Sequence, residues 1–577
     1  MRMGRVGIES KVSYPDVSGV SDVAAEPPLP TQPPRPRRRA GGYAMLVAAG
    51  ILLSRVAGLI RTSVFAHYLG ASAAADAFNV ALKVPNFLQN LLGEGVLSAS
   101  FIPVYSRLLS RGEEKVADRV AGVFASFLFI LVLVLVILGW LLTPVILSIT
   151  AAGLDAPTMA MAVKFTRILF PGVGLLVLYA WALGILNAHR QFFIAYVAPV
   201  LWSAAMIATL VIFGMRLQGA ALANALAWGT LVGCALQFAI EIPFVLRHAK
   251  HLSFGFDRTL EPVRTIFRNI GPVVGGRGVV QISGYIDTFI ATFLPTGAVT
   301  SFFYAQTIYL MPVSVFGMSV AAAELPEMSR ETGSQEEVYA ALRRRLDRSV
   351  RQVAFFVVPT TVAFILIGNV IVAALFERGK FTHNTTLVVW YTLIGASAGL
   401  LVATLGRLYS SAFYALHDTR TPFRYAMARV FGGAALAFLF AFPLRPMFAQ
   451  AVRALGLPLP DVEGGGTVLG IVGITLASAC AAWIEFLLLR RGIRRRVGKG
   501  ESKRAYMVKL WASALAAGIV AVLVDRYLAR PLAASLPLSK IVEAVLTCGT
   551  FGVVYFGAGL LLGIPEVKAT LGRLKRG

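Results

Sequence analysis

The stretch FASFLFILVLVLVILGWLL, residues 124–142, decides the fold class of this 577-residue chain, because it is long, apolar and without charge. A helix needs roughly 20 apolar residues to cross about 30 Å of hydrocarbon, and a backbone in lipid must satisfy its own hydrogen bonds. The apolar residues run on continuously, which favours a transmembrane helix over a strand of a barrel. Similar runs at 354–376 and 549–564 predict further helices of this kind.

Composition extends this prediction to the whole chain. Hydrophobic residues make up 57% of it and charged residues only 14%, against about 25% charged in soluble domains. The sequence therefore predicts an all-α membrane protein with about fourteen transmembrane helices. We place them at 44–67, 74–106, 118–142, 158–187, 192–214, 218–246, 264–294, 299–329, 349–376, 385–415, 421–443, 467–490, 506–528 and 540–563.

The net charge of +25 is explained by the loops between these helices. Cations gather in alternate loops, as they do on the cytoplasmic side of a membrane. We therefore expect a multi-pass protein of the cytoplasmic membrane, with both termini cytoplasmic and no nucleic-acid partner. The three cysteines, Cys234, Cys480 and Cys548, lie in apolar runs without ligand spacing, so no metal site is predicted.

An internal repeat indicates two lobes. YLGASAAADAF at 68–78 is matched by FLPTGAVTSFF at 293–303, each in the turn that opens a helical hairpin. Two six-helix lobes in pseudo-twofold repeat, plus two C-terminal helices, is the simplest architecture, and a transporter's substrate site usually lies between such repeats. The predicted division is a disordered cytoplasmic leader at 1–43, an N-lobe at 44–246, a cytoplasmic linker at 247–263, a C-lobe at 264–490, and the last two helices with a basic tail at 491–577.

Several charged side chains fall inside the predicted helices, where each costs about 2.5–3.5 kcal/mol at the centre of a membrane. At 100° per residue, those of the second helix share one stripe. They could pair, as Arg55 with Asp76 or Lys83 with Glu94, and join two helices. Alternatively, they line a cationic, water-filled chamber that receives an anion, for which arginine supplies a bidentate fork. The candidate residues are Arg55, Arg61, Lys83, Asn86, Asn90 and Arg277 for binding, and Asp76, Glu94 and Asp287 as gating or coupling acids.

Motifs of other function classes are missing from the sequence. No metal-ligand spacing, nucleophile elbow or phosphate loop occurs, so an enzyme or a pump driven directly by ATP is not predicted. A membrane-embedded glycan transferase would need paired acids near outer loops, and the long outer loop holds only Asp461 and Glu463.

Four segments carry a resemblance to a known family. They are SRVAGLIR at 54–61, ADAFNVALKVPNFLQNLLGEGVLSASFIPVYSR at 75–107, FERGKFT at 376–382 and SAFYALHDTRTPFR at 411–424. With them the chain resembles the MurJ (MviN) family of lipid II flippases, in the multidrug/oligosaccharidyl-lipid/polysaccharide exporter superfamily. The resemblance implies fourteen helices in two lobes, a central cationic cavity, and a groove for the polyprenyl tail formed by helices 13 and 14.

The same resemblance gives roles to residues and marks departures. Arg55, Arg61, Asp76, Lys83 and Glu94 match family positions. Two cations of the family pattern are replaced, one by Gln89 and the other, in an acid–arginine pair, by Gln306 and Thr307. We expect Arg277 to restore one cation to the cavity.

The mode of energy coupling is implied only by the resemblance to the family. The family is linked to membrane potential and cations, and Asp287 matches the acid of a proposed sodium site. The partner helix at 426–442 offers no Asn or Asp, which argues against a complete sodium site. Membrane potential, protons or sodium remain the options, without a cofactor.

We therefore predict a flippase that moves an undecaprenyl-diphosphate-linked peptidoglycan precursor, lipid II, from the inner to the outer leaflet by alternating access. Its partners would be that lipid or a similar polyprenyl-diphosphate glycan, membrane lipids, and cell-wall synthesis proteins. The alternatives are a flippase for another polyprenyl-linked glycan and a non-transporting scaffold derived from the family, the latter kept open by the lost arginines.

Overall fold

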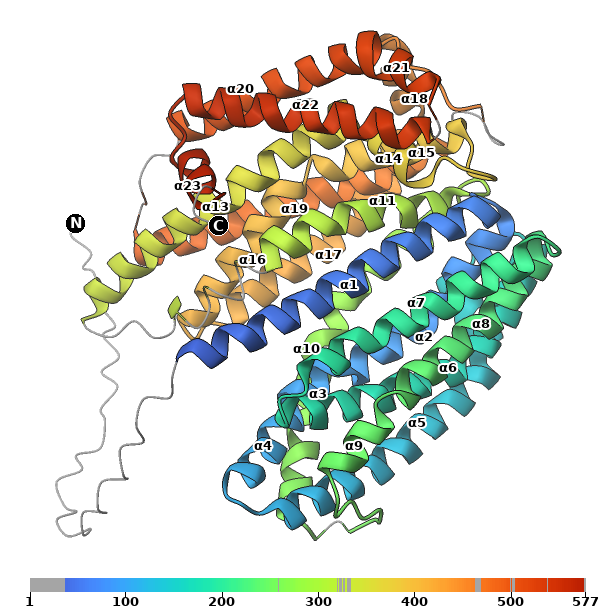
Figure 1. Ribbon diagram of the computed structural model, residues 1–577, viewed down its shortest axis with the longest axis vertical. Helices are drawn as coiled ribbons and strands as arrows, with labels where there is room; N and C mark the ends of the chain where they lie inside the picture. The colour runs from blue at the N-terminus through green and yellow to red at the C-terminus, as the bar shows by residue number, and fades with distance from the viewer. Residues whose placement is uncertain are drawn as a thin grey trace, which may run out of the picture.

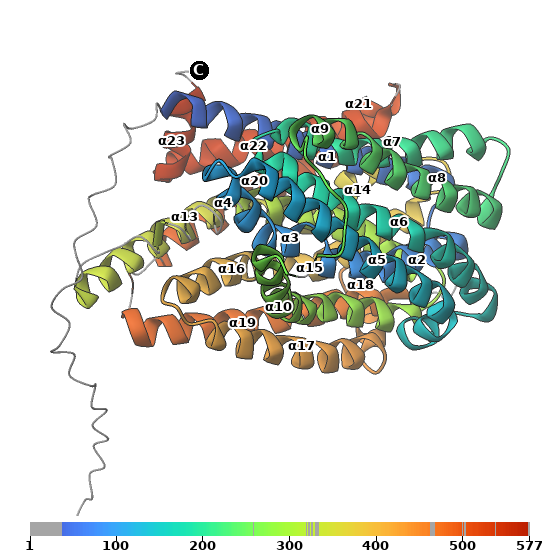
Figure 2. The same cartoon turned by 90° about the horizontal axis from the view of Figure 1, so that it is seen from below.

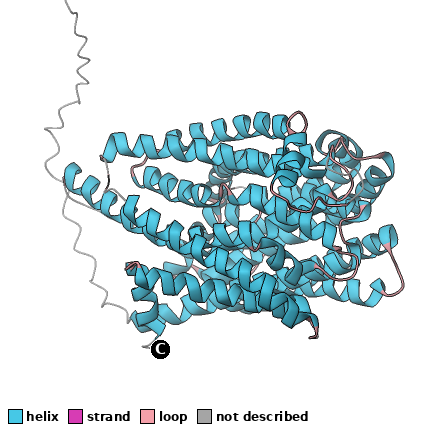
Figure 3. Ribbon diagram, turned by 90° about the horizontal axis from the view of Figure 1, so that it is seen from above, coloured by secondary structure: helices cyan, strands magenta, loops and turns pink. Residues whose placement is uncertain are grey.

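A computed structural model describes residues 37–574 of the chain, except 258, 319, 321–323, 325–326, 329–333, 462–467, 499, 501–503 and 537. The described part consists of helices and the loops that join them (Figure 3). The fold class is therefore confirmed as all-helical. The predicted leader lies largely outside the described residues, and α1 begins at Arg37, so the last residues of that predicted segment are helical.

The helices follow one another along the chain as the apolar runs predict. In the first half they are α1 (Arg37–Leu69), α2 (Ala73–Leu92), α3 (Glu94–Ser100), α4 (Ile102–Ser110), α5 (Glu114–Thr150), α6 (Ala156–Ala188), α7 (Phe192–Gly214), α8 (Gly219–Ala239) and α9 (Ile242–His248). In the second half they are α10 (Glu261–Thr292), α11 (Ala298–Pro312), the π-helix η1 (Val313–Met318), α13 (Gln335–Leu366), α14 (Gly368–Phe376), α15 (His383–Ser397), α16 (Leu400–Ala415), α17 (Arg420–Ala441), α18 (Arg445–Ala454), α19 (Gly470–Val497), α20 (Arg504–Val524), η3 (Asp525–Ala529), α21 (Arg530–Ala534), α22 (Ser539–Leu561) and α23 (Pro565–Leu574).

Judged by their length and apolarity, fewer helices of the described structure can span a membrane than the fourteen predicted. Within the described residues, 10 helices are long and apolar enough to cross a membrane, or 11 if α15 and α16, bent by 42°, form one span. The predicted spans that do not qualify contain α1, α2 and α10. α2 carries Asp76 and Lys83 and α10 carries Asp287, which lowers the apolarity of these two helices, whereas most side chains in the first half of α1 lie outside the described residues. The count of fourteen is thus not confirmed, although each predicted segment contains helix.

The second predicted helix is broken, which corrects the single stripe proposed for it. α2 ends at Leu92, and Gly93 has a non-helical ψ of −146°. A Cβ on Gly93 would stand 2.3 Å from the carbonyl oxygen of Gln89, so the break requires glycine. Glu94 therefore opens a new helix, α3, and does not continue the face of Asp76 and Lys83.

The helices gather in two groups with α1 between them (Figure 1). The blue-to-green helices α2–α9 lie on one side, and the yellow-to-red helices from α13 onward lie on the other. α10 joins the groups, because it packs on α3 and α5 and also on α17 and α19 (Figure 2). Contacts between the groups are therefore made mainly by α1, α2, α10 and α11.

The segment SAFYALHDTRTPFR forms the turn between α16 and α17. His417 adopts a positive φ of 58°. The Asp418 carboxylate accepts hydrogen bonds from the backbone N–H groups of Arg420 and Thr421, each at 3.0 Å, and from the Thr421 hydroxyl at 2.6 Å. Arg496 of α19 forms an ion pair with it at 2.6 Å. The bonds from Thr421, with the charge of Arg496, lower the pKa of Asp418 to about 2.

We expect Asp418→Asn to lower the stability of the purified protein at pH 7 by about 1 kcal/mol, since it weakens charge-assisted hydrogen bonds. The folded-state pKa lies below the unfolded one, so this contribution is present above about pH 4 and disappears as the pH falls towards 2. Thermal unfolding of both proteins across this pH range checks the prediction. A difference that grows as the pH falls would contradict it.

Candidate functional site

The turns of the two sequence repeats meet between the helix groups, at the N-termini of α2 and α11. Asp76, only 3% exposed, accepts hydrogen bonds from the backbone N–H groups of Gly297 at 2.6 Å and Thr300 at 2.8 Å. The Thr300 hydroxyl donates a third, at 2.5 Å, and accepts one from Asn79 at 3.1 Å. A carboxylate at a helix N-terminus binds the unpaired N–H groups and the positive end of the dipole. Asp76 therefore anchors α11 to α2.

Backbone contacts reinforce this junction. The Tyr304 hydroxyl donates to the carbonyl of Gly70 at 2.8 Å, and the Ser63 hydroxyl of α1 donates to the carbonyl of Leu375 at 2.5 Å. The N–H of Lys380 donates to the carbonyl of His67 at 2.8 Å. All of these bonds join α1 or the α1–α2 turn to the second half of the chain. We call this set of contacts, with those of Asp76, the hairpin junction.

Lys83 lies two turns further along α2 and contacts α10. Its ammonium donates to the carbonyl of Gly284 at 2.6 Å and to the Thr288 hydroxyl. It lies over the rings of Tyr285, at 5.5 Å from the centroid, and Phe303, at 5.5 Å. The Tyr285 hydroxyl donates back to the carbonyl of Lys83. Lys83 is therefore a cation held between α2 and α10. We call this contact region between the two helices the seam.

The other predicted binding residues lie at different depths on α1 and α2. The Arg61 guanidinium stacks over the Trp202 ring of α7, with 4.5 Å from its central carbon to the ring centroid. Arg55 is exposed one and a half turns earlier on α1. Asn86 is half-buried and Asn90 exposed on α2. The roles of these four residues remain predictions.

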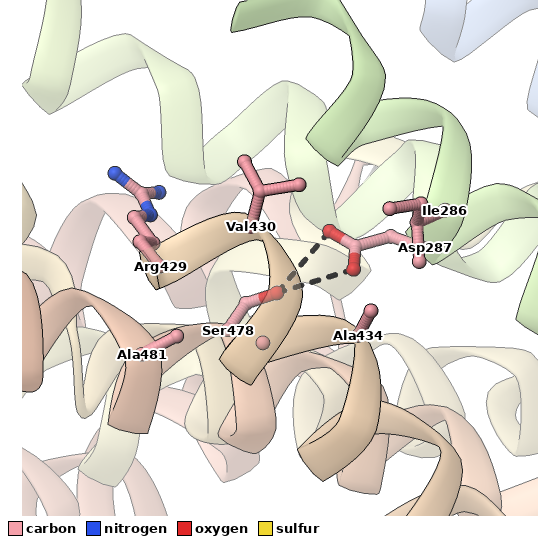
Figure 4. A pocket seen from close by; sticks show the side chains of 8 residues that line it. Ile286, Asp287, Arg429, Val430, Ala434, Ser478 and Ala481 are labelled. Atoms are coloured by element: carbon pink, nitrogen blue, oxygen red, sulfur yellow. Dashed lines mark hydrogen bonds between the residues drawn. The ribbon is translucent and has the colours of Figure 1, made fainter. Parts of the chain in front are cut away.

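Asp287 of α10 lines a small polar pocket of about 10 Å³ between α10, α17 and α19 (Figure 4). Ser478 of α19 donates to its two carboxylate oxygens, at 3.2 and 3.3 Å. Arg429 stands at the rim with its guanidinium turned away from Asp287, and it pairs with Glu485 at 3.0 Å. The remaining lining residues, Ile286, Val430, Gly433, Ala434 and Ala481, offer no side-chain oxygen.

Of the two pairs considered, that of Arg55 with Asp76 is not formed in the described part of the structure, where Asp76 bonds to α11. Lys83 bonds to α10, and its pairing with Glu94 stays untested. The physical reason is that both side chains face the other helix group, where free backbone groups accept or donate. The side chains of Glu94 and Arg277 lie outside the described residues, so the expectation that Arg277 restores a cavity cation stays untested.

Several residues of the site were missed by sequence reasoning. Thr300 lies in the quoted repeat FLPTGAVTSFF, so the repeat itself was a signal for it. Arg429 and Glu485 are charged residues inside predicted helices, which was a signal that they pair. Tyr285, Ser478 and Trp202 gave none, because their contribution depends on packing between distant helices.

Two helical groups are held together at one end by the hairpin junction and are joined further along by polar side chains between α2 and α10. This arrangement defines a two-lobed polytopic membrane transporter. Two solved structures have a similar fold. One is "Lipid II flippase MurJ, inward closed conformation", with a TM-score of 0.69 at 22% identity, covering 90% of this chain and 98% of that one. Another is an inward-facing multidrug resistance MATE family transporter of the MOP superfamily, with a TM-score of 0.60 at 17% identity, covering 78% and 98%.

Sequence comparison places the chain within this class. Residues 65–453 match the family model described as "Lipid II flippase MurJ". A probable lipid II flippase MurJ of Rhizobium meliloti is 31% identical over 546 residues, covering 92% of this chain and 95% of the relative. A lipid II flippase MurJ of Burkholderia cenocepacia is 29% identical, with 78% and 84% covered. The chain belongs to the MurJ family.

Proposed function

We propose that this protein is a flippase that carries lipid II, an undecaprenyl-diphosphate-linked glycopeptide, from the inner to the outer leaflet. The observation that carries the proposal is family membership over nearly the whole chain, at 31% identity across 92% of it. Cations on helices between the lobes suit an anionic headgroup that must cross a hydrophobic barrier. No step requires a nucleophile or a metal.

The contacts between the lobes support alternating access. The hairpin junction joins the two lobes near the end of α1, whereas Leu52, Leu53 and Arg55, near the middle of α1, are exposed. In the proposed cycle the contacts of the junction must break to release substrate on that side. Asp76 is placed to control that step, because its carboxylate spans the two lobes.

The diphosphate would bind to the cations of α1 and α2. Arg55 and Arg61 supply planar forks that suit phosphate oxygens, and Lys83 supplies a point charge in the seam. Arg277 belongs to the same proposal, since it lies on α10. Gln89 and Thr307 replace two cations of the family pattern, so a looser grip on the diphosphate is expected.

We further propose that the protein lies in the cytoplasmic membrane with its termini and the basic N-terminal part of α13 inside. Arg343, Arg344 and Arg348 are clustered there, and clusters of cations resist translocation. The hairpin junction is then the outer end of the seam. An alkaline phosphatase fused after Ala340 should be inactive, and activity there would refute this orientation.

We propose that the pocket around Asp287 is not a complete sodium site. A hard cation takes several oxygen ligands, and this pocket offers one carboxylate and one hydroxyl beside a paired arginine. We expect activity to be unchanged when potassium replaces sodium in a transport assay with reconstituted vesicles at constant membrane potential. A loss of more than ten-fold without sodium would contradict this prediction.

Complementation tests the proposed function. A bacterium depleted of its own lipid II flippase should grow and keep its shape when it expresses this chain. Failure, with normal membrane levels of the protein, would favour the scaffold alternative. If the chain restores only a pathway that uses a different polyprenyl-linked glycan, that glycan would be favoured as the substrate.

A further inference from the structure

The turn between α14 and α15, residues 377–382, packs against the α1–α2 turn in the hairpin junction. The N–H of Lys380 donates to the carbonyl of His67 at 2.8 Å. Gly379 and Gly70 adopt φ values of 59° and 58°, which favour glycine. A Cβ at Gly379 would stand 2.4 Å from the carbonyl oxygen of His67, and one at Gly70 would stand 2.6 Å from that of Lys380. The two turns therefore meet backbone to backbone, so a shift of the α14–α15 turn must disturb the junction.

Glu377, the first residue of this turn, faces away from the junction towards α22, and its side chain is 14% exposed. One of its carboxylate oxygens pairs with the Lys540 ammonium of α22 at 3.5 Å. The other accepts from the Thr386 hydroxyl at 2.7 Å and lies 3.3 Å from Nδ1 of His383, both on α15. α14 itself contacts both α1 and α22 (Figure 1). The turn is thus held between the hairpin junction and α22.

Lys540 also belongs to an ion network within the C-terminal helices. Asp525 of η3 and Glu543 of α22 are each 6% exposed. Arg530 of α21 pairs with both, at 2.9 and 3.3 Å, and Lys540 lies 3.9 Å from Glu543. Buried carboxylates that lose a cationic partner are strongly destabilised, so these pairs hold η3, α21 and α22 together. Since η3 continues α20, we call the four helices, residues 504–561, the C-terminal unit.

The Lys540 ammonium therefore stands between two carboxylates that belong to different parts of the molecule. Glu543 lies in the C-terminal unit, and Glu377 lies in the turn that forms the junction. Without the ammonium the two negative charges would repel each other across this boundary, and water would screen that repulsion poorly because both side chains are largely buried. With the ammonium in place, the same two carboxylates hold the turn against α22.

We propose that Glu377 and Lys540 are positioning residues of the hairpin junction, through which the C-terminal unit sets how readily the junction opens. The inference rests on the proposed function and adds residues that control its closed state. In the predicted architecture the two C-terminal helices stand outside the two six-helix lobes. The contact gives them a part in the transport cycle, because the turn that they hold must lose its contacts with α1 when the lobes separate.

Glutamine substitutions test this role in the purified full-length chain, without substrate. Spin labels replace Arg216 and Arg453, which are exposed in the two helix groups. Lys540→Gln leaves Glu377 and Glu543 without the cation between them, so the share of long distances between the labels should rise at least about three-fold. Glu377→Gln should raise it about 1.5-fold, because the amide keeps one acceptor oxygen. In the double variant one carboxylate is lost together with the cation, so the share should fall below that of Lys540→Gln alone.

Arg530→Gln is the matched control, because it removes a cation whose partners, Asp525 and Glu543, both lie within the C-terminal unit. It should lower the temperature of thermal unfolding without changing the distances. Glu377→Gln decides the test if Lys540→Gln does not fold, since it leaves Lys540 paired with Glu543.

Three results would each overturn the proposal. They are unchanged distances in the single variants of Glu377 and Lys540 that fold, a double variant at least as open as Lys540→Gln, and an equal opening in Arg530→Gln. The proposed function is tested separately. If the unmodified chain fails to complement a flippase-depleted strain while the distances change as expected, the function is wrong and the positioning role stands.

Discussion

Replacing Asp76 by alanine should release α11 from α2 and open the hairpin junction. The substitution leaves the buried N–H groups of Gly297 and Thr300 and the Thr300 hydroxyl without their acceptor. Each unsatisfied buried donor costs about 1–3 kcal/mol, so the closed junction should lose about 2–5 kcal/mol after partial hydration. That is enough to invert an equilibrium between closed and open states. Complementation should be lost, because the protein can no longer close this end.

Spin labels on opposite lobes can measure the opening. Arg216 and Arg453 are exposed, one in each helix group, and they can be changed to cysteine after Cys234, Cys480 and Cys548 are replaced. The distance distribution between the labels should shift to longer values in Asp76→Ala and partly so in Asp76→Asn, which keeps one acceptor oxygen. An unchanged distribution in the alanine variant would refute the role of Asp76.

Asp155 gives the matched control, since its carboxylate caps α6 within a single lobe, accepting from Thr158 N–H at 3.4 Å. Asp155→Ala should lower the stability by about 1 kcal/mol, as the loss of a helix cap does. It should not change the distance between the lobes. This control separates a general loss of stability from the opening of the junction.

Arg55→Ala and Arg61→Ala should each abolish complementation while the protein remains in the membrane at normal levels. A charge-assisted hydrogen bond to a phosphate contributes about 1.5–3 kcal/mol, so transport of the labelled lipid should fall about ten- to hundred-fold. Lysine at either position should rescue only in part, because it keeps the charge but loses the bidentate fork.

Because Arg61 stacks on Trp202, substitutions of Trp202 also test the role of the Arg61 guanidinium. Trp202→Phe keeps an aromatic face, so it should retain most of the activity, whereas Trp202→Ala should lower it by freeing the guanidinium. Arg216→Ala, on the exposed turn between α7 and α8, serves as the control and should complement fully. Full complementation by both Arg55→Ala and Arg61→Ala would remove these arginines from the binding site.

Much of the fold could be predicted from the sequence, because membrane helices follow from local apolarity. Each predicted segment contains helix, from α1 to α22. The breaks could not be predicted, since they depend on contacts between distant segments. The bend between α15 and α16 lies at Gly399, where a Cβ would stand 2.7 Å from the Cα of Ala479. No local pattern shows that α19 passes so close to this glycine.

The candidate site divides in the same way. Charged residues inside apolar helices can be recognised in the sequence. Because a charge within a membrane needs water or a polar partner, Asp76, Lys83 and Asp287 were predicted as site residues. Their partners were not found. Asp76 and Gly297 are 221 positions apart, and a backbone N–H leaves no mark in a sequence. The pairing of Arg55 with Asp76, one of the two alternatives considered, is not formed because the free N–H groups at the start of α11 bind Asp76 instead.

The hairpin junction also constrains the residues at matching positions of the two repeats. Seven residues after Leu69 stands Asp76, and seven residues after Leu294, its counterpart in the second repeat, stands Ser301. A carboxylate at both positions would bring a second negative charge to the junction. The aspartate in one copy and the neutral serine in the other avoid that repulsion, so Ser301→Asp should destabilise the closed junction.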